Sequence, residues 1–478
     1  METGTQTCCD AAERDRPSAF TVHAMRRVAF LLLFATALAA AEPERGKLAE
    51  NIASRLDPAQ TYTLYLPNTY DAMKQQPLLF VFDPRGRGTF AAEIFKDAAE
   101  RYGWVVISSN QTRSDDDGAA NARAVRALLP EIGRYAIHPR RVYATGFSGT
   151  AILSCAIGIN TSAFAGVIGV GGRLVEHIPP AKFSFAHYGF AGDSDFNNRE
   201  MRVIDELLGR ERTTHRFQEF PGEHRWFPPE LAREAIEWME LLAIKAGLRP
   251  RDASFIATLY AQDIAAASAL TGVNALRRYR EIVRTFEGLH AIDDAAAAVQ
   301  RLENDPGVRR ESKDIEKWDA FEERTIAQIF SQIGNTFARL RADDILPTPS
   351  VLARELRVAE LQRRARRNGA EGATARRLLE ALYAHTSFYM VEQLMAKREY
   401  ELAAAVAGVA TLIHDDRWPA WYNLAAAQAR AGNRRRALES LEKAFAAGFE
   451  NREQLLADED FASLRAEARF KALAPPSQ

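Results

Sequence analysis

Ser148 stands in the stretch Gly146-Phe147-Ser148-Gly149-Thr150, directly after the apolar run Val142–Thr145. The run predicts a strand, and the residues that follow predict a helix over Ala151–Ile159. Glycines on both sides of the serine permit a strained turn that points the hydroxyl out of the fold. A hydroxyl presented in this way is typical of a nucleophile, which needs a base and a carboxylate to activate it.

His224 is the histidine best placed to act as the base. It follows the predicted strand Arg216–Phe220 and a Pro-Gly turn, so its loop can fold back over the serine. Three other histidines fit this position less well: His187 lies inside a predicted strand, His215 directly precedes one, and the third is His177.

Two carboxylates are candidates for the group that orients the imidazole. Asp193 and Asp195 both follow the predicted strand Phe185–Phe190, in the stretch Gly-Asp-Ser-Asp. Asp193 can instead hold the turn through a hydrogen bond to its own backbone. Asp205 and Glu206, further along the chain, are weaker alternatives.

Attack on a carbonyl creates a negative oxygen that backbone amides must stabilise. The amide of Gly149 is the first expected donor. The second should come from the turn after the predicted strand Leu78–Phe82. Pro84 in that turn has no amide hydrogen, which leaves Arg85 or Gly86 as the donor.

An alternation of strands and helices must position these residues. Between residues 60 and 247, near-continuous apolar runs alternate with amphipathic stretches, which predicts an α/β fold with a mostly parallel sheet covered on both faces. An active site then belongs at the carboxyl ends of the strands. The predicted strands are Tyr62–Leu66, Leu78–Phe82, Trp104–Ser108, Val142–Thr145, Val167–Val170, Phe185–Phe190 and Arg216–Phe220, and the predicted helices are Phe90–Tyr102, Ala119–Tyr135, Ala151–Ile159, Arg199–Gly209 and Glu230–Ala246.

With these motifs the segment resembles the α/β-hydrolase family, especially esterases of the polyhydroxybutyrate-depolymerase and feruloyl-esterase type. The resemblance implies a catalytic triad of Ser148, Asp195 and His224, where a glycine three positions before the acid selects Asp195. It also implies an acyl-enzyme mechanism on carboxylic esters, with neither metal nor organic cofactor. A serine peptidase of related fold is the nearest alternative.

The sequence departs from the family pattern in two places. Thr150 stands where the nucleophile turn commonly ends in glycine, and a β-branched residue allows a less close approach of helix and strand. Asp83-Pro84 replaces the His-Gly pair that often forms the oxyanion turn. We therefore expect a slightly reshaped turn and a less certain second donor.

The character of the sequence changes after Arg249-Pro250, where strand signals end and helical periodicity continues through 251–383. The region 384–473 carries small residues that recur 34 positions apart, as in Ala403 and Ala437. It resembles tetratricopeptide repeats with a capping helix. The resemblance implies a protein or peptide partner, and a binding module with a degenerate hydrolase domain is an alternative function.

The amino-terminal segment predicts export. A basic start at Met25, a short apolar core and an Ala-x-Ala exit indicate a signal peptide over 25–41, so that 1–24 reads as a mis-assigned extension. We expect a periplasmic or secreted protein with no membrane span after cleavage. Cys155 would be the single thiol of the mature chain and is expected to be buried. A net charge of −1 argues against nucleic-acid binding.

Overall fold

The computed structural model describes residues 43–114, 118–172, 183–342 and 348–473. The predicted extension, the predicted signal peptide and His177 lie outside these ranges. Within them, every helix is too short or too polar to cross a lipid bilayer.

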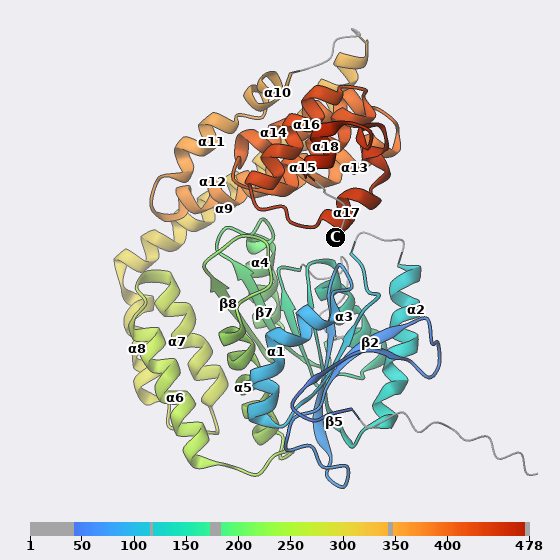
Figure 1. The fold of residues 1–478 in the computed structure, drawn as a ribbon. Coiled ribbons are helices and arrows are strands. Elements are labelled where there is room, and N and C mark those ends of the chain that lie inside the picture. Colours follow the sequence, from blue (N-terminus) through green and yellow to red (C-terminus); the bar gives the residue numbers. More distant parts are fainter. Residues whose placement is uncertain (1–42, 115–117, 173–182, 343–347, 474–478) are drawn as a thin grey trace, which may run out of the picture. The chain divides into compact units, whose positions relative to one another are not determined.

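An eight-stranded sheet forms the first part of the described chain (Figure 1). Its strand order is β1-β2-β4-β3-β5-β6-β7-β8, and all pairs from β4 onward are parallel, while β1–β2 and β2–β4 are antiparallel. The strands are β1 (Leu48–Ala53), β2 (Thr61–Tyr65), β3 (Gln76–Phe82), β4 (Val105–Ser109), β5 (Ile137–Phe147), β6 (Gly166–Val170), β7 (Ala186–Gly192) and β8 (His215–Phe220).

All seven predicted strands are present, and the sequence missed only β1. This strand lies at the edge of the sheet, where Glu50 and Asn51 are exposed, so it lacks the apolar run that marks the central strands. The sheet consequently begins before residue 60.

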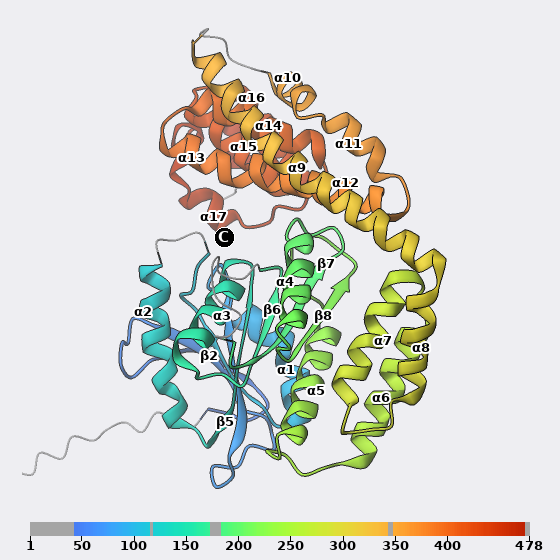
Figure 2. The ribbon, with the colours of Figure 1, turned by 180° about the vertical axis from the view of Figure 1, so that it is seen from behind.

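Helices cover both faces of the sheet (Figures 1 and 2). On one face, Phe95 of α1 and Trp238 of α5 pack in the same apolar core as the strands. On the other face, Leu128 of α2 and Cys155 of α3 do so. The helices are α1 (Gly88–Tyr102), α2 (Ala119–Leu128) with the 3₁₀ turn η1 (Leu129–Arg134), α3 (Gly149–Thr161), α4 (Asn198–Arg210) and α5 (Pro229–Lys245).

This arrangement is a mixed, mostly parallel sheet with helices on both faces, the α/β fold class that the sequence predicts. Cys155 is buried in the core, and this burial raises the pKa of its thiol to about 12. A thiol held neutral in this way serves packing and not nucleophilic attack.

The rest of the described chain is mostly helical. The paired repeat positions Ala403 and Ala437 are fully buried, as are Ala410 and Ala444, while their assignment to tetratricopeptide repeats stays a prediction. The elements are α6 (Ala253–Ser268), α7 (Gly272–Phe286), α8 (Asp293–Asn304), α9 (Pro306–Ala342), α10 (Pro349–Glu355), α11 (Val358–Ala365), α12 (Gly369–Ala384), the π-helical turn η3 (His385–Tyr389), α13 (Met390–Ala396), α14 (Tyr400–Ile413), α15 (Trp418–Arg430), α16 (Arg434–Ala446), α17 (Arg452–Ala457), the 3₁₀ turn η4 (Glu459–Leu464) and α18 (Ala468–Leu473).

Candidate active site

Ser148 occupies the single-residue turn between β5 and α3. Its φ of 56° and ψ of −129° are strained for a residue with a side chain, and such strain is typical of a functional position. Gly146 makes the turn possible, because a Cβ there would lie 2.2 Å from the carbonyl oxygen of Thr150. The serine hydroxyl is therefore presented at the carboxyl end of β5 by the local backbone.

Thr150 is fully buried and joins the two central strands. Its Oγ1 lies 2.6 Å from the carbonyl oxygen of Phe82 at the end of β3 and 2.8 Å from that of Phe147 at the end of β5. It also accepts a hydrogen bond from the amide of Phe147 at 3.1 Å. The hydroxyl thus satisfies polar groups that a glycine would leave to other partners.

Three side chains from three strand ends form a hydrogen-bonded chain. His224 Nε2 lies 2.9 Å from Ser148 Oγ, and His224 Nδ1 lies 2.9 Å and 3.0 Å from the two carboxylate oxygens of Asp195. Ser148 follows β5, Asp195 follows β7 and His224 follows β8. The structure therefore brings together the three residues that the sequence singled out.

The imidazole of His224 is held between two aromatic rings. The centroids of Phe147 and Phe196 lie 4.5 Å and 4.3 Å from that of the imidazole. Gly171, at a φ of +54°, leaves room for the pair, since a Cβ there would come within 2.7 Å of Asp195 Oδ2. Asp195 is fully buried and also accepts a hydrogen bond from the amide of Asn197 at 2.8 Å. These contacts fix the orientation of both partners.

The other carboxylates and histidines that were considered have different environments. Asp193 is exposed and accepts a hydrogen bond from the amide of Gly222 at 3.2 Å, so it ties the acid loop to the histidine loop. Asp205 lies on α4 with its Oδ1 3.4 Å from His215 Nε2, and burial lowers the pKa of that imidazole. His187 is buried inside β7.

Gly149 is the first residue of α3, so its amide has no acceptor within the helix. The positive end of the helix dipole is at the same place, beside the hydroxyl of Ser148. A negative oxygen bound there meets both a free N–H and a favourable field.

The turn after β3 uses its own amides, in contrast to the expected second donor. The amide of Arg85 donates to Asp83 Oδ1 at 2.9 Å, and that of Gly86 donates to the carbonyl oxygen of Asp83 at 3.1 Å. Each amide has a single hydrogen, and in this arrangement neither is available to a substrate oxygen. A second donor has to come from elsewhere.

Asp83 connects this turn to the histidine loop. Its carboxylate is fully buried, forms two hydrogen bonds with the guanidinium of Arg87, and accepts one from the indole Nε1 of Trp226 at 3.0 Å. Burial alone would raise the pKa of this carboxyl, but the hydrogen bonds from Arg87 and Trp226 hold the pKa below its ordinary value. Asp83 therefore remains a charged anchor near neutral pH.

The sequence did not predict that Asp83, Phe196 and Trp226 position the residues of the candidate site. Asp83 carried a usable signal, because a carboxylate directly after a buried strand and before an Arg-Gly turn is placed to bind amides. The aromatic residues gave no such signal, since their contacts depend on how three loops meet.

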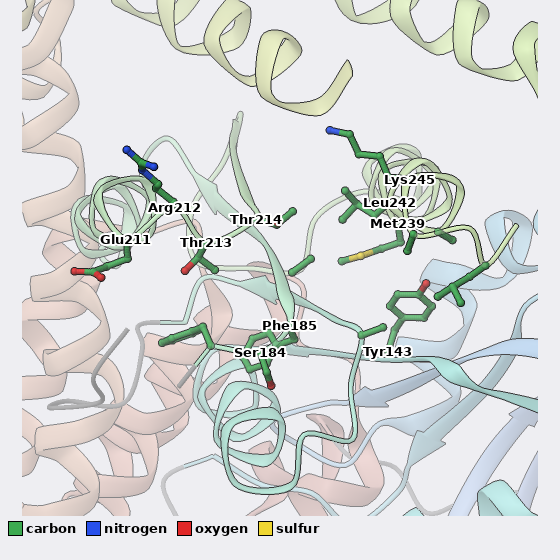
Figure 3. A pocket seen from close by; sticks show the side chains of 16 residues that line it. Tyr143, Ser184, Phe185, Glu211, Arg212, Thr213, Thr214, Met239, Leu242 and Lys245 are labelled. Carbon is green, nitrogen blue, oxygen red and sulfur yellow. The ribbon is translucent and has the colours of Figure 1, made fainter. Parts of the chain in front are cut away.

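A cavity of about 650 Å³ lies elsewhere on the sheet, among side chains that include Phe185, Thr214 and Lys245 (Figure 3). Ala165 and Thr214 in its lining directly precede β6 and β8. The cavity is therefore at the amino ends of the strands, whereas the Ser148 hydroxyl is at the carboxyl ends.

No protein-family model matches the sequence. No curated protein matches it either. Among solved structures, a ferulic acid esterase is similar with a TM-score of 0.35 and 15% identity, over 40% of this chain and 96% of that one. A fluorophosphonate-binding serine hydrolase F of Staphylococcus aureus has a TM-score of 0.33 and 13% identity, over 38% and 92%. An S-formylglutathione hydrolase of Staphylococcus aureus has a TM-score of 0.34 and 14% identity, over 41% and 98%.

These structural neighbours are esterases and serine hydrolases. Each covers about two fifths of this chain, and at such identities and TM-scores the activity has to be argued from the site itself.

Proposed function

We propose that this protein is a serine hydrolase that cleaves carboxylic esters through Ser148, His224 and Asp195. The observation that carries the proposal is the continuous hydrogen-bonded chain from the Ser148 hydroxyl through the imidazole to the buried carboxylate. The backbone at Ser148, with a φ of 56° and a ψ of −129°, supports it, because strain of this kind is typical of functional positions.

In the proposed mechanism each group has its own step. His224 Nε2 takes the proton of Ser148 as its Oγ attacks the ester carbonyl, and Asp195 holds the Nδ1–H tautomer and stabilises the imidazolium. The amide of Gly149 donates to the oxygen that becomes negative. His224 then returns the proton to the leaving alcohol, and a water activated by the same imidazole releases the acyl group.

The first prediction is that Ser148→Ala lowers kcat for a short-chain nitrophenyl ester by about 10⁴-fold or more while the protein stays folded. Removing the nucleophile leaves only the modest effect of the remaining site. Turnover should be measured together with the circular dichroism spectrum and with labelling by a fluorophosphonate probe. The matched control is Ser194→Ala, which removes a hydroxyl bonded to Asp193 in the acid loop and should keep both turnover and labelling.

Full activity in Ser148→Ala would overturn the assignment of the nucleophile. An ester should be turned over faster than the matching peptide anilide, and the reverse order would instead favour the peptidase alternative. A folded wild type that neither labels nor hydrolyses would favour a binding protein with a degenerate hydrolase domain.

We further propose export and a partner. The basic and apolar pattern of residues 25–41 supports a periplasmic or secreted location, which the size of the protein recovered from each cell fraction tests. The small, buried residues that recur in the helical region support a surface for a protein or peptide. No cofactor is required by the steps above.

A further inference from the structure

The hydroxyl of Ser114 is a buried polar group that forms no hydrogen bond with the described residues. Its Oγ is shielded from solvent and has no hydrogen-bond partner among the residues that the structure describes. A buried hydroxyl left unpaired costs about 1–3 kcal/mol, and such groups in native proteins call for an explanation.

Ser114 lies against the residue whose amide faces the nucleophile. A Cβ added to Gly149 would be 2.6 Å from Ser114 Oγ, 3.0 Å from its Cβ and 3.4 Å from its Cα. Any side chain at position 149 would therefore displace Ser114. The glycine leaves room for this hydroxyl as well as for the turn.

The distance suits two donors that share one acceptor. A Cβ lies about 2.5 Å from the nitrogen of its own residue, so Ser114 Oγ is within about 5 Å of the Gly149 nitrogen. Two donors that each lie about 3 Å from one oxygen are at most about 6 Å apart. This separation therefore permits one oxygen to accept hydrogen bonds from both the Gly149 amide and the Ser114 hydroxyl.

The backbone around Ser114 is fixed on the turn after β3. The amide of Ser114 donates to the carbonyl oxygen of Pro84 at 2.9 Å, and Thr112 Oγ1 donates to that of Asp83 at 3.0 Å. The amide of Arg113 donates to Asn121 Oδ1 at 2.8 Å. This turn therefore positions Ser114 although its own amides at Arg85 and Gly86 are engaged.

We propose that the Ser114 hydroxyl is the second donor to the oxyanion, beside the amide of Gly149. The inference rests on the proposed hydrolase function. The hydroxyl keeps its proton throughout, and its hydrogen bond is strongest when the carbonyl oxygen carries negative charge. It thus acts on the transition state more than on the bound ester.

The test is Ser114→Ala, assayed with the same nitrophenyl ester as the wild type. We expect kcat to fall about 10²-fold with KM changed less than about threefold, because the lost donor acts mainly on the transition state. Affinity for an alkyl boronic acid, which forms a tetrahedral adduct with the serine, should fall by a similar factor. Stability in urea should be unchanged or higher, because the removed hydroxyl has no partner in the fold.

The matched control is Ser108→Ala. Ser108 in β4 also has a buried hydroxyl without a hydrogen-bond partner in the described part of the chain. The nearest contacts of a Cβ added at Gly149 are all with Ser114, so Ser108 is not among them. The kcat of Ser108→Ala should equal that of the wild type. Ser114→Cys, with a weaker donor of similar size, should show an intermediate kcat and provides the test if the alanine variant fails to fold.

Two results would overturn the inference. One is a kcat for Ser114→Ala, or for Ser114→Cys in its place, equal to that of the wild type. The other is a loss of kcat matched by a loss of stability, with boronic acid affinity unchanged, which would indicate a structural role only. An inactive wild type would overturn the proposed function and this inference together.

Discussion

Thr150 shows how one residue adapts the nucleophile turn of this protein. Its hydroxyl contacts the ends of β3 and β5, and a glycine would offer the same backbone but no hydrogen-bonding group. The β-branched side chain is tolerated because it is fully buried and its hydroxyl lies against the carbonyl oxygens of Phe82 and Phe147 at the two strand ends. The departure from the family pattern therefore reinforces the turn.

At this scale we predict that Thr150→Val lowers the free energy of unfolding by about 1–3 kcal/mol. Valine keeps the shape but leaves the amide of Phe147 and a strand carbonyl unpaired in the core. Urea unfolding and kcat should be measured together, and kcat should fall because Ser148 is two residues away. Thr150→Ser keeps the hydroxyl and should remain close to the wild type. A Thr150→Val protein as stable as the wild type would show that the hydrogen bonds contribute nothing net.

The turn after β3 and the histidine loop are linked elements. Asp83 directly follows β3, and Trp226 lies two residues beyond His224, so the hydrogen bond between their side chains links the histidine loop to the end of β3. Trp226 also packs edge-on against Phe95 of α1, with centroids 6.1 Å apart. The position of the imidazole thus depends on contacts made outside the triad.

We predict that Asp83→Asn costs about 2 kcal/mol of stability and lowers kcat at nearly unchanged KM. The new amide group must face a donor, either the indole of Trp226 or the guanidinium of Arg87. Trp226→Phe is the graded comparison, because it removes one donor and leaves the ion pair in place. Urea titration and steady-state kinetics of both variants test this. A larger loss of kcat in Trp226→Phe than in Asp83→Asn would contradict the link.

The stability of the whole molecule should depend on pH through two histidines outside the triad, the buried His187 and the partly buried His385. Burial, with a smaller effect from the nearby His215, lowers the pKa of His187 to about 4. Burial likewise lowers the pKa of His385 to about 4. An unfolded chain binds a proton at these side chains near pH 6.5, and the native chain does so only near pH 4. The free energy of unfolding is therefore not reduced by these histidines above about pH 6.5, and it decreases as the pH falls toward 4.

The corresponding prediction is that the free energy of unfolding falls by up to about 3 kcal/mol per histidine between pH 6.5 and pH 4. His187→Asn removes one titrating group and should flatten this dependence. Urea unfolding at pH 7, 5.5 and 4.5 measures it in both proteins. Equal slopes in the variant and the wild type would contradict the assignment to His187.

Much of the sheet-containing domain could be predicted because its local signals agree with one another. Six of the seven predicted strands lie inside the sheet, where burial on both faces gives them apolar runs, and the seventh, the edge strand β8, is also largely buried. The edge strand β1 was missed, since an exposed edge needs no such run. The tetratricopeptide assignment of the helical region stays a prediction, because small buried residues alone do not define that repeat.

The meeting of Ser148, Asp195 and His224 was expected from the sequence, because the carboxyl ends of neighbouring parallel strands share one edge of the sheet. Only the tertiary structure decided which donors their surroundings offer. An amide binds the nearest suitable oxygen, and at Arg85 and Gly86 that oxygen belongs to Asp83. The hydroxyl of Ser114 reaches Gly149 from a loop 35 positions away in the chain, a proximity set by packing between loops and not by any local pattern.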